Sequence, residues 1–249
     1  MTPIFSGWRA LLLMSALAAL TTLTTLTACD KPAHEHPYFP LAEGHSWTYE
    51  VSTQFDDPEG HTDITHTTLT NLGGELLNNQ PSWRRRSTEG VEYWLRQDDK
   101  GLTRVATRSA LDARATLDAA PRTVLPDPLL VGAHWETDTT LYFLRRRSER
   151  PAEFRLVEKY KAIPMTYTVT DLNQKVSTPA GDFEGCALVS GRADVVMWIE
   201  SAMSFKPTPV LTREWYCRGV GLVQLEREEP TTARFFQGGF LRMKLTAWH

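Results

Sequence analysis

Residues 47–52, with the sequence WTYEVS, decide the fold because apolar and polar side chains alternate along them. This period of two is typical of a strand that buries one face and exposes the other. Residues 241–245, with the sequence LRMKL, repeat the alternation near the other end of the chain. We therefore predict strands at both ends of one folded domain.

Strand-like segments also fill most of the chain between these two ends. The sequence predicts them at residues 63–72, 82–86, 92–96, 102–107, 134–144, 153–171, 183–191, 211–217 and 222–226. Residues 109–120 are rich in alanine and leucine and begin with a capping serine, a pattern typical of a helix. We predict a mostly β domain over residues 38–249, with a single curved antiparallel sheet or partly closed barrel and one or two short helices.

A short sequence pattern occurs twice in the chain. Residues 40–47 (PLAEGHSW) and 128–135 (PLLVGAHW) share proline, leucine, glycine and tryptophan at the same spacing. In each copy, glycine gives the loop backbone freedom and tryptophan supplies a large surface at the start of a strand. We predict a duplicated β-unit whose two halves share one sheet or barrel, with coincidence between two loops as the alternative.

The N-terminus has the pattern of an export signal. Arg9 is the only charged residue before Asp30, and an apolar stretch follows it over residues 10–20. Spanning a bilayer takes about 20 apolar residues, so this stretch better matches the apolar core of a signal peptide. Residues 26–29 (LTAC) follow, and they resemble the lipobox of bacterial lipoproteins.

The lipobox resemblance implies that residues 1–28 are removed and that Cys29 is acylated, so that lipid anchors the protein to a membrane of the cell envelope. An unlipidated secretory signal is the alternative. Each acyl methylene group buried in lipid contributes about 0.8 kcal/mol, so several chains on one residue form a durable anchor. Residues 29–37 would form a tether, with the domain facing the periplasm. Asp30 resembles an inner-membrane retention signal of enteric bacteria, which favours the inner membrane over the outer one.

Two cysteines remain in the mature chain, Cys186 and Cys217. An exported protein matures in an oxidising compartment, which favours a disulfide between them. In the chain-entropy model, closing a loop of this size stabilises the fold by about 3–4 kcal/mol. Two buried thiols packed as small apolar groups are the alternative.

Three further segments resemble those of uncharacterised bacterial lipoproteins and secreted proteins. They are residues 38–49 (YFPLAEGHSWTY), 178–186 (TPAGDFEGC) and 216–223 (YCRGVGLV). The resemblance implies strand edges in a curved antiparallel sheet and carries no catalytic residues. The general shape is also similar to the half-barrel of lipoprotein carriers, a likeness of fold alone.

Composition and motifs exclude several classes of function. The formal net charge of the 249 residues is −3, and no basic field is present of the kind that nucleic-acid binding requires. No Gly-x-Ser-x-Gly elbow, P-loop or dinucleotide-binding turn occurs, so we predict no catalytic residues and no cofactor. His34 and His36 lack the further ligands that a closed metal site needs, and we predict no metal.

A cluster of apolar residues near position 200 is the candidate binding surface. Methionine and aromatic side chains suit an adaptable apolar site, although short apolar runs also form core strands. The candidate ligand-binding residues are Trp47, Trp135, Val195, Trp198, Ile199, Met203 and Phe205. We predict a membrane-anchored, non-enzymatic binding or scaffold protein for an apolar ligand or an envelope partner. The alternatives are a hydrolase-type enzyme with a site assembled from distant strands and a passive structural lipoprotein.

Overall fold

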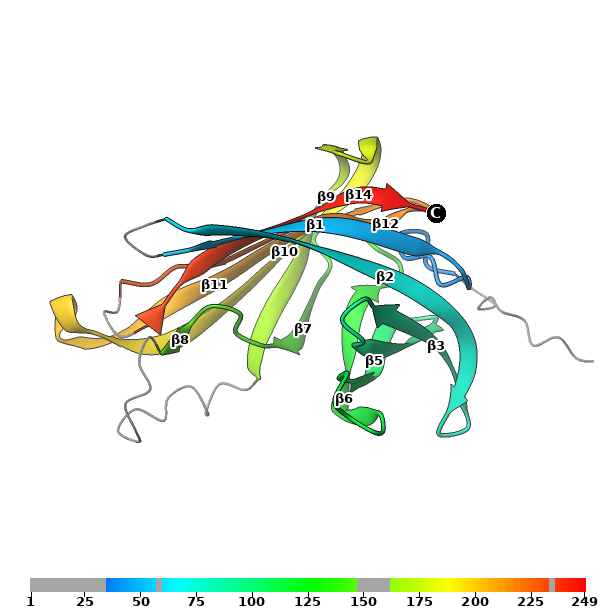
Figure 1. The fold of residues 1–249 in the computed structure, drawn as a ribbon, viewed down its shortest axis with the longest axis horizontal. Helices are drawn as coiled ribbons and strands as arrows, with labels where there is room; N and C mark the ends of the chain where they lie inside the picture. Colours follow the sequence, from blue (N-terminus) through cyan, green and yellow to red (C-terminus); the bar gives the residue numbers. More distant parts are fainter. Residues whose placement is uncertain (1–34, 57–59, 147–161, 233–235) are drawn as a thin grey trace, which may run out of the picture.

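The computed structural model describes residues 35–249 apart from 57–59, 147–161 and 233–235. Twelve strands form one antiparallel sheet in the order β6-β5-β4-β3-β2-β1-β14-β12-β11-β10-β9-β7 (Figure 1). The remaining strands, β8 (Arg145–Arg146) and β13 (Phe236–Gln237), pair with each other. The prediction of a mostly β protein with one curved, partly closed antiparallel sheet is confirmed.

The sheet consists of two meanders of six strands each. The first half comprises β1 (Ser46–Phe55), β2 (Thr62–Leu77), β3 (Gln80–Ser87), β4 (Glu92–Asp98), β5 (Gly101–Arg108) and β6 (Thr116–Pro126). The second half comprises β7 (His134–Thr139), β9 (Ile163–Thr178), β10 (Gly181–Ile199), β11 (Ser204–Cys217), β12 (Gly221–Glu229) and β14 (Gly239–Trp248). In each half, every strand pairs with the next one of that half.

The two junctions between the halves differ. At one junction, β1 and β14 form an antiparallel ladder along nearly their whole length. At the other junction the sheet curves round until β6 and β7 approach each other, but they form no ladder (Figure 1). A hydrogen bond of 3.1 Å from the Arg122 guanidinium to the Asp138 carbonyl oxygen crosses this gap. We call this open junction between β6 and β7 the seam.

The repeated sequence pattern forms the same loop in both halves. Gly44 and Gly132 have φ angles of +85° and +87°, which only glycine adopts readily. The Gly44 amide donates to the Asn71 carbonyl, and the Asn71 amide donates to the His45 carbonyl. In the second copy, the Gly132 amide donates to the Val169 carbonyl, and the Val169 amide donates to the Ala133 carbonyl. The two loops therefore share a backbone hydrogen-bond pattern, as a duplicated β-unit requires.

The inner face of the curved sheet holds the main core, to which both halves contribute. Leu41 and Leu129 of the two repeated loops are buried in the same cluster, together with Leu102 and Val189. Cys186 on β10 and Cys217 on β11 are joined by the disulfide that the sequence favoured. The two halves thus share one interior.

Two expectations differ from the structure. The helix predicted at residues 109–120 is wrong: this segment turns and then enters β6, where Thr116 and Leu117 pair with β5. Sheet pairing outweighs the weak helical preference of the segment. The only helical turn in the described part of the chain is a 3-10 turn at Glu200–Ala202.

The packed chain also begins earlier than the predicted boundary at residue 38. The His36 ring is buried and lies 3.1 Å from the Pro126 carbonyl oxygen, and the Leu41 amide donates to the Glu35 carboxylate. The end of the predicted 29–37 tether is therefore part of the domain. Cys29, with its predicted lipid, lies outside the described residues.

Candidate functional site

A cavity of about 230 Å³ lies inside the curved sheet at the seam. Both halves of the domain line it, the first through β5 and β6 and the second through β7, β9, β11 and the loop after β7. The lining residues are Arg104, Arg122, Thr123, Val124, Trp135, Thr137, Asp138, Thr139, Thr140, Tyr142, Tyr167, Glu214 and Tyr216. Sites for drug-sized ligands usually measure about 300–1,000 Å³, so this cavity suits a smaller molecule.

Aromatic rings form one wall of the cavity. Trp135 on β7 and Tyr167 on β9 stack with their ring centroids 5.5 Å apart and their planes 11° apart. The Trp135 indole nitrogen is buried and has no hydrogen-bond acceptor among the described residues. Leaving a buried donor unpaired typically destabilises a fold by about 1–3 kcal/mol. Within the described chain, this wall therefore contains a buried donor without a hydrogen-bond acceptor, which an ordinary protein core avoids.

A carboxylate faces the cavity from β11. The Tyr216 hydroxyl donates to the Glu214 carboxylate over 2.5 Å, and both side chains line the cavity. No arginine, lysine or histidine of the described chain lies within ion-pair distance of Glu214. Burial raises the pKa of Glu214, and the Tyr216 hydrogen bond and the more distant Arg227 charge oppose this rise only in part. A desolvated carboxylate without an ion pair is a mark of functional sites.

Three tyrosine hydroxyls lie close enough to Glu214 to sense its charge. Burial raises the pKa of Tyr167 and Tyr216, desolvation raises the pKa of the half-exposed Tyr142, and the negative charge of Glu214 raises each of the three further. These tyrosines come from the loop after β7, from β9 and from β11. Glu214 thus lies among phenol groups that the fold gathers from separate elements.

Two arginines of the cavity lining share one carboxylate, that of Asp118. Arg104 forms a bidentate ion pair with Asp118, with both nitrogen–oxygen distances at 2.9 Å. The Arg122 guanidinium lies 3.7 Å from the same carboxylate. The pair and its neighbour hold the β5–β6 wall of the cavity in place.

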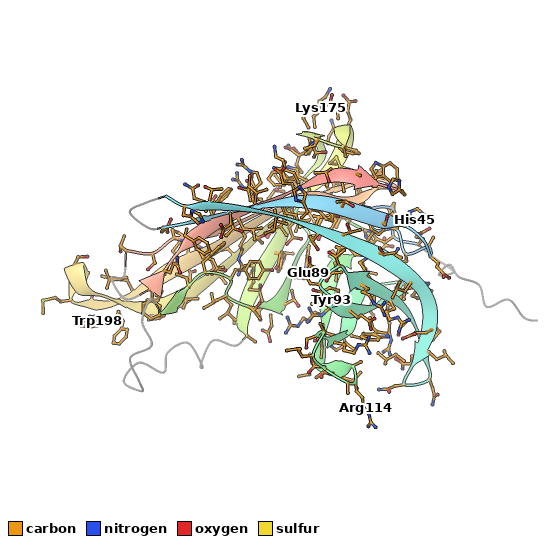
Figure 2. All side chains as sticks on the ribbon, viewed as in Figure 1. His45, Glu89, Tyr93, Arg114, Lys175 and Trp198 are labelled. Atoms are coloured by element: carbon orange, nitrogen blue, oxygen red, sulfur yellow. A yellow bond between two sulfur atoms is a disulfide. The ribbon has the colours of Figure 1, made fainter. Side chains whose placement is uncertain are left out.

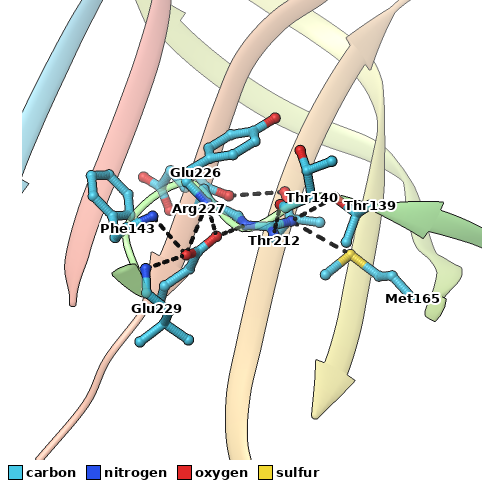
Figure 3. Close-up of polar contacts among 10 residues, drawn as sticks. Thr139, Thr140, Phe143, Met165, Thr212, Glu226, Arg227 and Glu229 are labelled. Carbon is cyan, nitrogen blue, oxygen red and sulfur yellow. Dashed lines mark hydrogen bonds and ion pairs between the residues drawn. The ribbon is translucent and has the colours of Figure 1, made fainter. Parts of the chain in front are cut away.

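A buried carboxylate fixes the loop that carries Tyr142 (Figure 3). Glu229 accepts hydrogen bonds from the backbone amides of Tyr142, Phe143 and Leu144 over 2.8–3.1 Å. It also accepts a 2.9 Å hydrogen bond from Arg227, which itself donates to the Thr140 carbonyl. Arg227 and Glu229 are both buried. This pair therefore holds the loop after β7, which contributes Thr140 and Tyr142 to the cavity lining.

The structure does not gather the candidate ligand-binding residues at one place. Of these residues, only Trp135 lines the cavity, whereas Trp47 is 1% exposed and belongs to a core cluster that both halves share. Val195 and Ile199 belong to β10 and are buried in an apolar core cluster, so the alternative interpretation as a core strand applies to them.

The other three candidates lie at the tip of the β10–β11 hairpin. Trp198 and Phe205 pack edge to face across the hairpin with centroids 5.3 Å apart, and Met203 is 80% exposed. Figure 2 places Trp198 at the opposite end of the molecule from His45. None of the three lines the cavity, so they form a separate surface.

The remaining residues of the cavity were not expected from the sequence. Their positions depend on how distant strands meet, which no local pattern records. One signal was available: Glu214 and Tyr216 lie two residues apart, so they share a face of a predicted strand. The inward face of a strand is ordinarily apolar, so a carboxylate next to a tyrosine on that face can indicate a site.

The described part of the chain contains no group of three or more histidine, cysteine, aspartate or glutamate side chains placed to hold a metal ion. No helix in that part is long and apolar enough to cross a membrane.

Comparisons with known proteins found distant structural likenesses. No family model matches the chain, and no curated protein matches it. A solved protein of Bacteroides fragilis, described as exported and YmcC-like in fold, is 12% identical with a TM-score of 0.36. A solved protein of Parabacteroides distasonis, described as a lipoprotein, is 16% identical with a TM-score of 0.33. In both cases the match covers 85% of this chain and 98% of the other, and we draw no conclusion about function from either likeness.

Proposed function

We propose that this protein is a membrane-tethered, non-enzymatic binding protein of the cell envelope that receives a small ligand in the seam cavity. The observation that carries the proposal is the contrast between the two junctions of the sheet. One junction is closed by a ladder, whereas the other is held apart around an aromatic cavity. Concave sites with aromatic walls and a few polar groups are typical of ligand binding.

The tether follows from the lipobox resemblance of residues 26–29. If lipid is attached at Cys29, the six residues from there to Glu35 can span at most about 20 Å. The domain would then stay near the membrane surface on the periplasmic side. Asp30 favours the inner membrane, and the outer membrane is the alternative.

Binding rather than catalysis is proposed because of the groups that meet in the cavity. The described lining residues include carboxylates, tyrosines and arginines but no histidine. A histidine and a carboxylate meeting in this cavity would have favoured the enzyme alternative. An envelope protein that docks at the exposed hairpin tip would be compatible with the same cavity.

Mass spectrometry of the protein extracted from membranes under native conditions tests the proposal. We expect a small molecule bound to the wild-type protein, lost from Trp135→Ala and retained by Trp198→Ala, which alters the remote hairpin tip. The same spectrum reports the acyl mass on Cys29. A ligand that is retained by Trp135→Ala, or is absent from the wild-type protein, would contradict the proposal.

A further inference from the structure

The charges around the seam cavity do not cancel. Arg104 is neutralised by Asp118, and Arg227 is neutralised by Glu229 at 2.9 Å. The charged lining residues left over are Arg122, Asp138 and Glu214. Of these three, Arg122 also approaches Asp118, and Asp138 is exposed at the seam. Glu214 is the carboxylate of the lining that is neither exposed nor in an ion pair within the described chain, and both lining arginines lie beside Asp118 on the β5–β6 wall.

We infer that the ligand carries a cationic nitrogen, as an amine or a quaternary ammonium group, and that Glu214 and the surrounding aromatic rings bind it. This inference rests on the proposed function and names the class of ligand that the same cavity receives. A desolvated carboxylate without an ion pair is costly to keep charged, and a cationic ligand would lower that cost.

The aromatic surroundings fit the same chemistry. Trp135, Tyr167 and Tyr216 line the cavity around the carboxylate, and aromatic rings attract organic cations through their negative faces. The protein already uses this contact beside the cavity, because the Arg227 guanidinium lies 4.9 Å from the centre of the Tyr142 ring. Desolvation strengthens such contacts, and the cavity provides it.

Size restricts the ligand further. A cavity of about 230 Å³ is smaller than the usual site for a drug-sized molecule. It suits a small amine or quaternary ammonium compound rather than the acyl chains of a lipid. This differs from the apolar ligand expected from the sequence, because the cavity combines aromatic rings with a charged group.

The test compares cationic probes with neutral ones of the same shape. Isothermal titration of the full-length protein in detergent would use choline and tetramethylammonium, with 3,3-dimethylbutan-1-ol as the neutral counterpart of choline. We expect at least one cation to bind at least tenfold more tightly than the neutral alcohol. Glu214→Gln should abolish this preference, whereas Glu184→Gln, which alters an exposed carboxylate on β10, should leave it unchanged.

The outcomes separate the inference from the proposed function. If the neutral alcohol binds as tightly as choline and both depend on Trp135, the cavity is a ligand site but the cation inference is overturned. If Glu214→Gln folds normally by circular dichroism and still prefers the cation, the inference is also overturned. Failure of every probe to bind overturns the cation inference, while a native ligand seen by mass spectrometry would still support the proposed function.

Discussion

The tryptophan that ends the repeated loop is buried and hydrogen-bonded in one copy, but in the other it is only partly buried and without an acceptor among the described residues. Trp47, in the first copy, is buried, and its indole nitrogen donates a 2.6 Å hydrogen bond to the Val220 carbonyl. Trp135, in the second copy, is only partly buried, and its indole nitrogen has no acceptor among the described residues. One tryptophan has become part of the core, and the other has become the wall of a cavity.

The neighbouring strands explain this difference. Strand β1 lies in the middle of the sheet and pairs with both β2 and β14, so Trp47 is covered from the second half of the chain. Among the described strands, β7 pairs with β9 alone, and its other edge faces the open seam. The repeated loop therefore contributes to the core where β1 and β14 close the sheet. It contributes to a candidate site where the sheet stays open between β6 and β7.

One pair of cross-strand neighbours has also diverged between the halves. In the first half, Asn71 and Arg85 face each other across β2 and β3. Arg85 donates to the Asn71 side chain over 2.8 Å, and its guanidinium lies 4.4 Å from the centre of the Trp47 ring. Burial lowers the pKa of Arg85 to about 10, with nearby tyrosines opposing the shift, so it stays charged at neutral pH. At the equivalent register of the second half, Val169 faces Val189.

The largest loss of stability should come from freeing the loop after β7, which Glu229 holds. Glu229→Ala should lower the free energy of unfolding by about 3–5 kcal/mol, because it leaves the buried Arg227 charge and three backbone amides without their acceptor. Urea denaturation measures this. Glu184→Ala breaks an exposed ion pair on the same half and should leave stability unchanged. Equal effects of the two variants would show that the Glu229 contacts do not hold the loop.

A double-mutant cycle tests the polar pair beside Trp47. Arg85→Met alone should cost about 3 kcal/mol and Asn71→Val alone about 2 kcal/mol, because each leaves a buried partner unsatisfied. The double variant, which makes this pair apolar as in the second half, should cost at least about 1 kcal/mol less than the sum. Strict additivity in urea denaturation would argue against a coupled pair.

The glycines of the repeated loops should respond equally to substitution. Gly44→Ala and Gly132→Ala should each cost about 1–2 kcal/mol, because alanine disfavours a positive φ and an added Cβ atom would meet nothing within 4 Å at either site. Thermal or urea unfolding of both variants measures the cost. A much larger cost at one site than at the other would break the equivalence of the loops.

The smallest effect concerns pH and the cavity carboxylate. Burial raises the pKa of Glu214 above its value in the unfolded chain, so the folded state favours the protonated form. Its contribution to stability is therefore lost as the pH rises from about 4.3 through the raised folded pKa. Glu214→Gln should become progressively more stable than the ligand-free wild type as the pH rises from about 4.3 through the raised folded pKa. A variant that becomes less stable than the wild type over this range would contradict the desolvation of Glu214.

The sequence predicted what local patterns can record. Alternation at residues 47–52 and 241–245 predicted strands, and the repeated pattern predicted two related loops, because both depend on near neighbours. The helix predicted at 109–120 was wrong because pairing between β5 and β6 decided that segment. The cavity was out of reach for the same reason: Arg104, Tyr167 and Glu214 meet only after the whole sheet has curved round to the seam.

The comparison of Trp47 with Trp135 can be tested most directly by the same substitution at both sites. Trp47→Phe should lower the free energy of unfolding by about 2–3 kcal/mol, because it leaves the Val220 carbonyl without its donor and the core underfilled. Trp135→Phe removes a donor that has no acceptor and should change the free energy by less than about 0.5 kcal/mol. Equal losses in urea denaturation would show that both tryptophans are core residues and would contradict the assignment of the seam as a site.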